Sequence, residues 1–277
     1  MLPIVMTRYM MDLTREQDIF MHTYLERYLE GDREGVWAEL VGLGPAVRDA
    51  RVCADAQAVA VEMMHRARHN VEILIGRLKE LRYRFANPEG PWTPPGPWIV
   101  KALDELEARF GPLPIVIRAW YERVGEVDFT GAYPRLSQFH GLDWDGSEEL
   151  GCYSDPLTAG WLASLQRGLA SFYINHGDWD EMERMERENP PPYGIDFGMS
   201  AINKANHSGA GSVQVMLPNP GFDAPLIDWD GDWMGTFFVP YLRTCFAWGG
   251  FPGFRNIPEG DRPLELLASL RADLQSL

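Results

Sequence analysis

The chain has 277 residues and a formal net charge of −15 at pH 7, from 25 basic and 40 acidic side chains. This balance argues against binding to nucleic acid or to an anionic membrane, because both require a basic protein surface. The sequence contains no run of about 18 apolar residues, so we expect no transmembrane helix.

The N-terminal stretch is apolar but has neither a basic leading region nor a small-residue cleavage site, so we do not interpret it as a signal peptide. The three cysteines are sparse and odd in number, which is typical of free thiols in a reducing compartment. We therefore expect a cytoplasmic protein.

A capping box formed by Thr14 and Gln17 predicts the start of the first helix, and Gly31 is a suitable residue to end it.

A second short helix fits residues 32–41. The strongest periodic segment is 55–82, where apolar residues recur every three or four positions, as they do on one face of a helix. Asp55 is a suitable N-cap for this helix. These patterns predict an N-terminal helical bundle or hairpin stack.

The long periodic segment also carries possible metal ligands. Glu62 and His65 have the spacing found in di-iron helices, and His65 and His69 have the spacing found in zinc sites. A di-iron bundle needs two such motifs and the chain offers one, while neighbouring arginines oppose a cation. We therefore expect a solvated polar face here, and no metal or other cofactor.

Five prolines fall within residues 87–97, which breaks regular structure. We predict a helical domain over 1–86, a linker or a surface strap over 87–97, and a second domain over 98–277. The acidic excess belongs to the second part: residues 86–277 hold 13 basic and 27 acidic side chains, a net charge of −14.

The second part mixes helix and strand patterns in separate runs, which predicts an α+β fold. Pro114 suits the first position of a helix. Pro240 limits the helix candidate around it, so that either the helix begins near residue 239 or a strand over 236–239 precedes it. The expected helices are 98–110, 114–124, 235–248 and 263–275, and the expected strands are 127–129, 193–199 and 212–217.

No phosphate-binding loop, nucleophile elbow or zinc-protease motif occurs in the sequence. The segment 228–233 alternates acids like a calcium loop but lacks the required glycine and glutamate positions. An enzyme would need a site assembled from dispersed residues. The candidates for that site are His176, Asp178, Asp196, Lys204 and His207.

Tryptophan repeatedly stands beside aspartate in the second part. An indole is a large contact group that is enriched at binding hot spots, and flanking carboxylates attract a basic partner. The alternative interpretation is that each indole anchors the core while its aspartates face solvent. The residues predicted to contact a partner are Asp228, Trp229, Asp230, Asp232 and Trp233, with Asp143, Trp144 and Asp145 as a second group.

Residues 99–129 resemble the opening of the SUKH superfamily, in which a helix ends in glycine, a Leu-Pro turn follows, and an aromatic helix and a glycine precede the first strand. The matching residues are Leu106, Phe110, Gly111, Leu113, Pro114, Trp120, Tyr121, Gly125 and Phe129. Val124-Gly125 stands where the family often has Asn-Gly. The resemblance extends over about residues 99–255 and leaves out the helical first part.

The SUKH resemblance implies an α+β domain with a mostly antiparallel sheet and a role in protein binding. Many members of the superfamily are bacterial immunity proteins that neutralise a cognate toxin, often a nuclease, and no catalytic residue comes with the family. We therefore predict a non-catalytic, immunity-type protein whose partner is a protein such as a basic toxin. The alternatives are the dispersed-site enzyme and a scaffold whose two parts bind different proteins.

Overall fold

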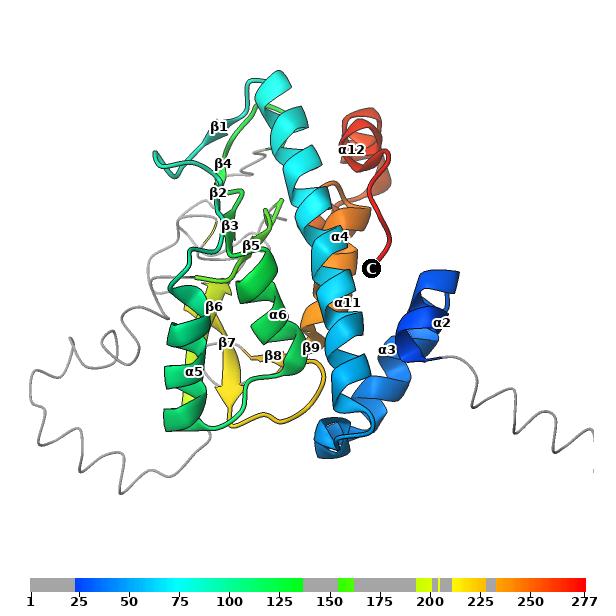
Figure 1. Ribbon diagram of the computed structural model, residues 1–277. Helices are drawn as coiled ribbons and strands as arrows, with labels where there is room; N and C mark the ends of the chain where they lie inside the picture. The colour runs from blue at the N-terminus through cyan, green and yellow to red at the C-terminus, as the bar shows by residue number, and fades with distance from the viewer. Residues whose placement is uncertain (1–22, 137–153, 162–192, 201–203, 205–210, 228–232) are drawn as a thin grey trace, which may run out of the picture.

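The computed structural model describes residues 23–136, 154–161, 193–200, 204, 211–227 and 233–277. These residues form helices packed against antiparallel strands, which confirms the predicted α+β fold (Figure 1).

The N-terminal helices are α2 (Tyr24–Glu30) and α3 (Arg33–Gly42), followed by the 3-10 turn η1 (Gly44–Arg48). Helix α2 begins at a capping box, in which the Thr23 hydroxyl accepts a hydrogen bond from the Glu26 amide and the Glu26 carboxylate accepts one from the Thr23 amide.

The predicted helix from Thr14 to Gly31 is therefore wrong as a continuous element, because Thr23 is extended, with φ −67° and ψ 162°. The predicted helix stop is confirmed, since Gly31 ends α2 in the left-handed region, with φ 113°.

Helix α4 (Cys53–Glu80) confirms the predicted long helix, but Asp55 is not its N-cap. Asp55 lies in the first turn of α4, and its carboxylate accepts hydrogen bonds from the amides of Tyr24 (2.6 Å) and Leu25 (3.2 Å). Asp55 thus satisfies two free amides at the start of α2, which no pattern within residues 55–82 indicates.

Helix α4 runs through the middle of the molecule, with α5 (Ile99–Phe110) and α6 (Ile115–Arg123) on one side and α2 and α3 on the other (Figure 1). Pro114 is extended and directly precedes α6, instead of occupying its first turn. Large apolar side chains of α6 and its end are fully buried: Ile117, Trp120, Tyr121 and Val124.

The strands of the described residues form three sheets, in which every pairing is antiparallel. Strands β6 and β7 have the predicted bounds. The first sheet pairs β1 (Arg84–Phe85) with β4 (Gly131–Ala132). The second has the spatial order β2 (Trp92–Thr93), β3 (Glu126–Asp128) and β5 (Thr158–Ala159). The third has the order β6 (Tyr193–Met199), β7 (Ser212–Leu217), β8 (Pro225–Ile227) and β9 (Trp233–Phe237).

The junction between the second and third sheets depends on Gly160, whose amide donates to the Phe197 carbonyl at 2.7 Å. Gly160 has φ +78°, and a Cβ there would lie 2.3 Å from the carbonyl oxygen of Gly125. Only glycine fits this close approach of two backbones.

The proline-rich segment 87–97 contains β2, which pairs with β3, and the Trp92 indole donates to the Val124 carbonyl at 2.7 Å. One cluster of buried side chains includes α4 as well as α5 and α6. The division into domains 1–86 and 98–277 stays a prediction.

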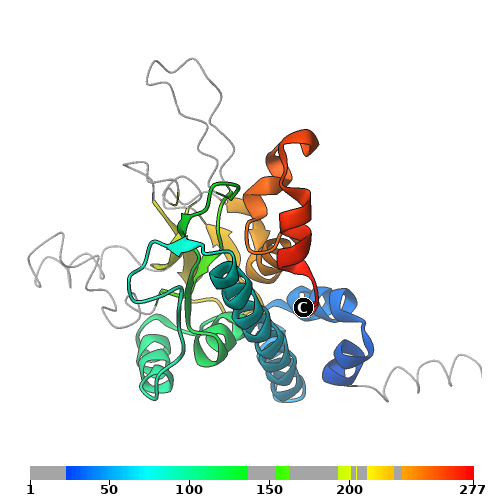
Figure 2. The ribbon, with the colours of Figure 1, turned by 90° about the horizontal axis from the view of Figure 1, so that it is seen from above.

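Two further helices complete the described chain, α11 (Phe238–Ala247) and α12 (Leu264–Arg271). Helix α11 begins at Phe238, which confirms the alternative in which the helix begins near residue 239. Strand β9 ends at Phe237, directly before it, so the predicted strand over 236–239 is wrong in its bounds. Leu267 and Leu270 of α12 are buried, whereas Leu264 is 47% exposed. In both views the C-terminal end lies near α2 and α3 (Figures 1 and 2).

Among the helices that the structure describes, none is both long and apolar enough to cross a bilayer.

Candidate functional site

The residues predicted to contact a partner fall largely outside the described residues. Segments 228–232 and 143–145 are not described, and of Trp233 the structure gives the backbone. Trp233 begins β9 opposite Ile227, the last residue of β8. The acidic segment 228–232 therefore joins two paired strands at a defined place on the third sheet.

Asp196 lies on the same sheet, two strands from β8. Its carboxylate accepts hydrogen bonds from the Ser212 hydroxyl and from the Gln214 side-chain amide (3.0 Å). Gln214 stands opposite Ile227 in the β7–β8 pairing. Asp196 is therefore a carboxylate fixed in the cross-strand row that Gln214 and Ile227 continue.

Lys204 has a different set of partners from Asp196. Its ammonium group donates to the Asp155 carboxylate at 2.6 Å and to the Tyr241 hydroxyl at 3.3 Å, and its side chain is 3% exposed. Asp155 adopts φ 47°, a left-handed conformation that aspartate tolerates better than most residues. Of the dispersed enzyme candidates, His176, Asp178 and His207 lie outside the described residues.

The surroundings of Lys204 contain two neutral acids. Burial raises the pKa of the Cys245 thiol to about 12 and raises the pKa of the Tyr241 phenol well above its ordinary value. Both groups are protonated at neutral pH, and a thiol rather than a thiolate is a weak nucleophile. The cluster thus consists of one buried ion pair with two neutral neighbours, and it ties the Asp155 loop to α11. Within the described chain, Cys53 and Cys245 are free thiols, as expected.

The polar motif of α4 behaves as expected from the sequence. The Glu62 carboxylate accepts a hydrogen bond from Arg66 at 2.7 Å, while His65 and His69 are exposed. The two histidines of this face are therefore solvated, and the Glu62 carboxylate is bound by the Arg66 guanidinium.

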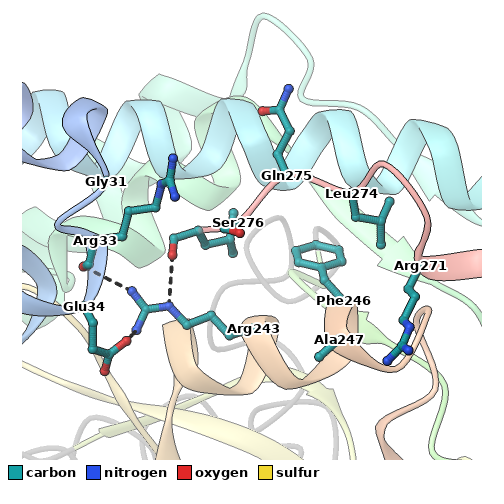
Figure 3. Close-up of a pocket in the computed structure, with 11 residues that line it drawn as sticks. Gly31, Arg33, Glu34, Arg243, Phe246, Ala247, Arg271, Leu274, Gln275 and Ser276 are labelled. Carbon is teal, nitrogen blue, oxygen red and sulfur yellow. Dashed lines mark hydrogen bonds and ion pairs between the residues drawn. The ribbon is translucent and has the colours of Figure 1, made fainter. Parts of the chain in front are cut away.

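A cavity of about 510 Å³ lies between the α2–α3 turn, α11 and the C-terminal segment (Figure 3). Sequence reasoning missed it, because its residues come from distant parts of the chain and form no local motif. Its lining is Gly31, Arg33, Glu34, Arg243, Phe246, Ala247, Arg271 and residues 274–277.

Arg243 holds the walls of this cavity together. Its guanidinium pairs with Glu34 and donates to the main-chain oxygens of Arg33 (3.3 Å) and Leu277 (3.1 Å) (Figure 3). It also lies over the Trp37 ring, 5.5 Å from the centroid. One side chain of α11 thus binds α3 and the C-terminal segment.

The C-terminal segment 272–277 is bound mainly through its backbone. Asn70, fully buried on α4, donates to the Gln275 carbonyl at 2.8 Å and accepts from the Gln275 amide at 2.7 Å. Arg66 donates to the Ser276 carbonyl at 3.3 Å, and the Leu277 side chain is 4% exposed. Side chains of α4 and α11 thus bind this segment largely through its main-chain atoms.

No family model matches this sequence, and neither a curated protein nor a solved structure matches it. The SUKH resemblance of residues 99–129 therefore stays a prediction that rests on the residues themselves.

Proposed function

We propose that this protein is a non-catalytic, cytoplasmic protein-binding module of the immunity type, which neutralises a basic toxin through acidic, tryptophan-bearing segments. The observation that carries the proposal is where the charge lies. Segments 137–153, 162–192 and 228–232 together hold 3 basic and 13 acidic side chains, a net charge of −10 out of the −14 in residues 86–277.

The same segments hold all three Asp-Trp-Asp sequences of the chain. A negative surface raises the rate at which a basic partner is encountered, and an indole supplies contact area once the two proteins meet. Charge and contact groups therefore occur together in the sequence, as a binding surface for a basic protein requires.

Three tryptophans outside these segments have structural roles. Trp120 is fully buried, the Trp37 indole donates to Asp223 at 2.8 Å, and the Trp92 indole donates to Val124. The interpretation of tryptophan as a core anchor fits these three residues. We assign the partner-binding role to Trp229 and Trp144, each of which has an aspartate on both sides.

The test is protection against a toxic partner by co-expression with the products of genes adjacent to its own. The decisive variant is Asp228→Asn/Asp230→Asn/Asp232→Asn, which removes three negative charges. A matched control, Glu259→Gln/Asp261→Asn/Glu265→Gln, removes three charges from exposed residues of the described chain.

We expect the unaltered protein to restore growth in the presence of a toxic neighbour and to co-purify with it. The first variant should lose protection and the control should keep it. Failure of the unaltered protein to protect against or bind any neighbouring product, or equal behaviour of the two variants, would contradict the proposal.

A further inference from the structure

We propose that the cavity between α3, α11 and the C-terminal segment binds an acidic peptide segment of a partner protein. The cavity has a charge opposite to that of the whole chain. Three arginines, Arg33, Arg243 and Arg271, line it together with one acidic side chain, Glu34, which is already paired with Arg243.

Arg33 and Arg271 form no ion pair with any carboxylate of the described chain. The Nε of Arg33 is buried and has no hydrogen-bond partner among the described residues. A buried donor without an acceptor is costly. Arg33 therefore brings to the cavity a positive charge that no carboxylate of the described chain pairs with.

A second unpartnered donor lies directly behind Arg33. The Tyr28 hydroxyl is buried without a partner, and the guanidiniums of Arg33 and Arg66 lie 5.9 Å and 5.2 Å from the Tyr28 ring centroid. Two positive groups thus lie over one buried ring, and one of them, Arg33, also lines the cavity. The excess of positive side chains in and around the lining favours an acidic ligand over a neutral one.

The arrangement of side chains indicates the shape of the ligand. Arg33 and Arg271 stand toward opposite ends of the lining, with the apolar side chains of Phe246 and Leu274 between them (Figure 3). A ligand that satisfies this order has carboxylates on both sides of an apolar group. A volume of about 510 Å³ is in the range of ligand sites and accommodates a few residues of an extended peptide.

The C-terminal segment, which forms one wall of the cavity, favours a peptide over a small dicarboxylate as the ligand. Asn70 and Arg243 bind residues 275 and 277 through main-chain atoms, so this region of the fold already binds one extended chain. The inference does not rest on the acidic segments of the proposed function. Binding of an acidic peptide in this cavity would be a second protein interaction, as the scaffold alternative with two different partners requires.

The experiment measures fluorescence anisotropy of a fluorescein-labelled peptide, acetyl-Glu-Glu-Leu-Leu-Glu-Glu-amide, titrated with the full chain. A peptide with glutamine in place of every glutamate tests the need for charge, and unlabelled succinate tests whether a small dicarboxylate suffices. The variants are Arg33→Gln and Arg271→Gln. The matched control is Arg51→Gln, an exposed arginine that does not line the cavity.

We expect saturable binding of the acidic peptide and none of the glutamine peptide. Each cavity variant should weaken binding at least about tenfold, which is about 1.4 kcal/mol, while Arg51→Gln should change it less than about twofold. Circular dichroism checks that the variants are folded. Absence of saturable binding, equal effects of the three arginine variants, or competition by succinate as strong as by unlabelled peptide would overturn the assignment. None of these results depends on the toxin-protection assay.

Discussion

Asp223 offers the most quantitative test of the packing described above. This carboxylate is 4% exposed, and it accepts hydrogen bonds from the Trp37 indole (2.8 Å), the Ala224 amide (2.8 Å) and the Val239 amide (3.1 Å). It therefore joins α3 to the first turn of α11. Burial raises the pKa of Asp223 to about 6, because the loss of solvation outweighs these hydrogen bonds and the nearby Arg243.

The sign of the pH effect follows from this shift. The folded state binds a proton on Asp223 more readily than the unfolded state, whose aspartate has a pKa near 3.8. The resulting stabilisation is fully present below that value and is lost as the pH rises through about 6. Between pH 7 and pH 5, the free energy of unfolding should gain on the order of 1 kcal/mol from this one group.

The assay compares the unaltered protein with Asp223→Asn by urea denaturation at pH 7, 6 and 5, followed by tryptophan fluorescence. Because asparagine does not titrate, the stability of the unaltered protein relative to the variant should rise by on the order of 1 kcal/mol from pH 7 to pH 5. Other groups, such as Glu39 with its lowered pKa, are common to both proteins and cancel. A difference that does not change with pH would refute the reasoning.

Three further substitutions test single contacts. Asn70→Ala removes both hydrogen bonds to Gln275 and should cost about 2 kcal/mol in urea denaturation, with faster hydrogen exchange over 272–277; unchanged exchange would contradict the account. Lys204→Met leaves the Asp155 carboxylate unpaired and should cost about 3 kcal/mol, of which addition of Asp155→Asn should restore a part; additive losses would argue against the ion pair. Gly160→Ala should cost more than about 2 kcal/mol in thermal unfolding, whereas Gly260→Ala, which meets no neighbour, should cost little.

Helices and the longer strands could be predicted because their signals are local. Apolar spacing indicated α4, and the strands 193–199 and 212–217 were predicted with their observed bounds. Where a residue's partner comes from a distant segment, the prediction was incomplete or wrong. Asp55 caps α2 instead of its own helix, and the strand Trp92–Thr93 exists because it pairs with residues 126–127.

The cavity could not have been predicted from any motif. Arg33 and Arg243 are 210 positions apart, and Arg271 lies on yet another helix. Folding brings these arginines together, so their cluster cannot be seen in the linear sequence. Composition pointed in the opposite direction, since a net charge of −15 gives no reason to look for a basic site. The Asp-Trp-Asp segments, in contrast, are visible in the sequence and lie outside the described residues.

The central claim, that the protein binds a basic partner through acidic, tryptophan-bearing segments, is tested most directly by the association rate as a function of ionic strength. With the toxin identified by co-expression, we predict that this rate falls at least about tenfold between roughly 0.05 M and 0.5 M salt. The same measurement on Asp228→Asn/Asp230→Asn/Asp232→Asn should give a slower rate with a shallower salt dependence. A rate that is independent of salt and unchanged by the three substitutions would contradict the account.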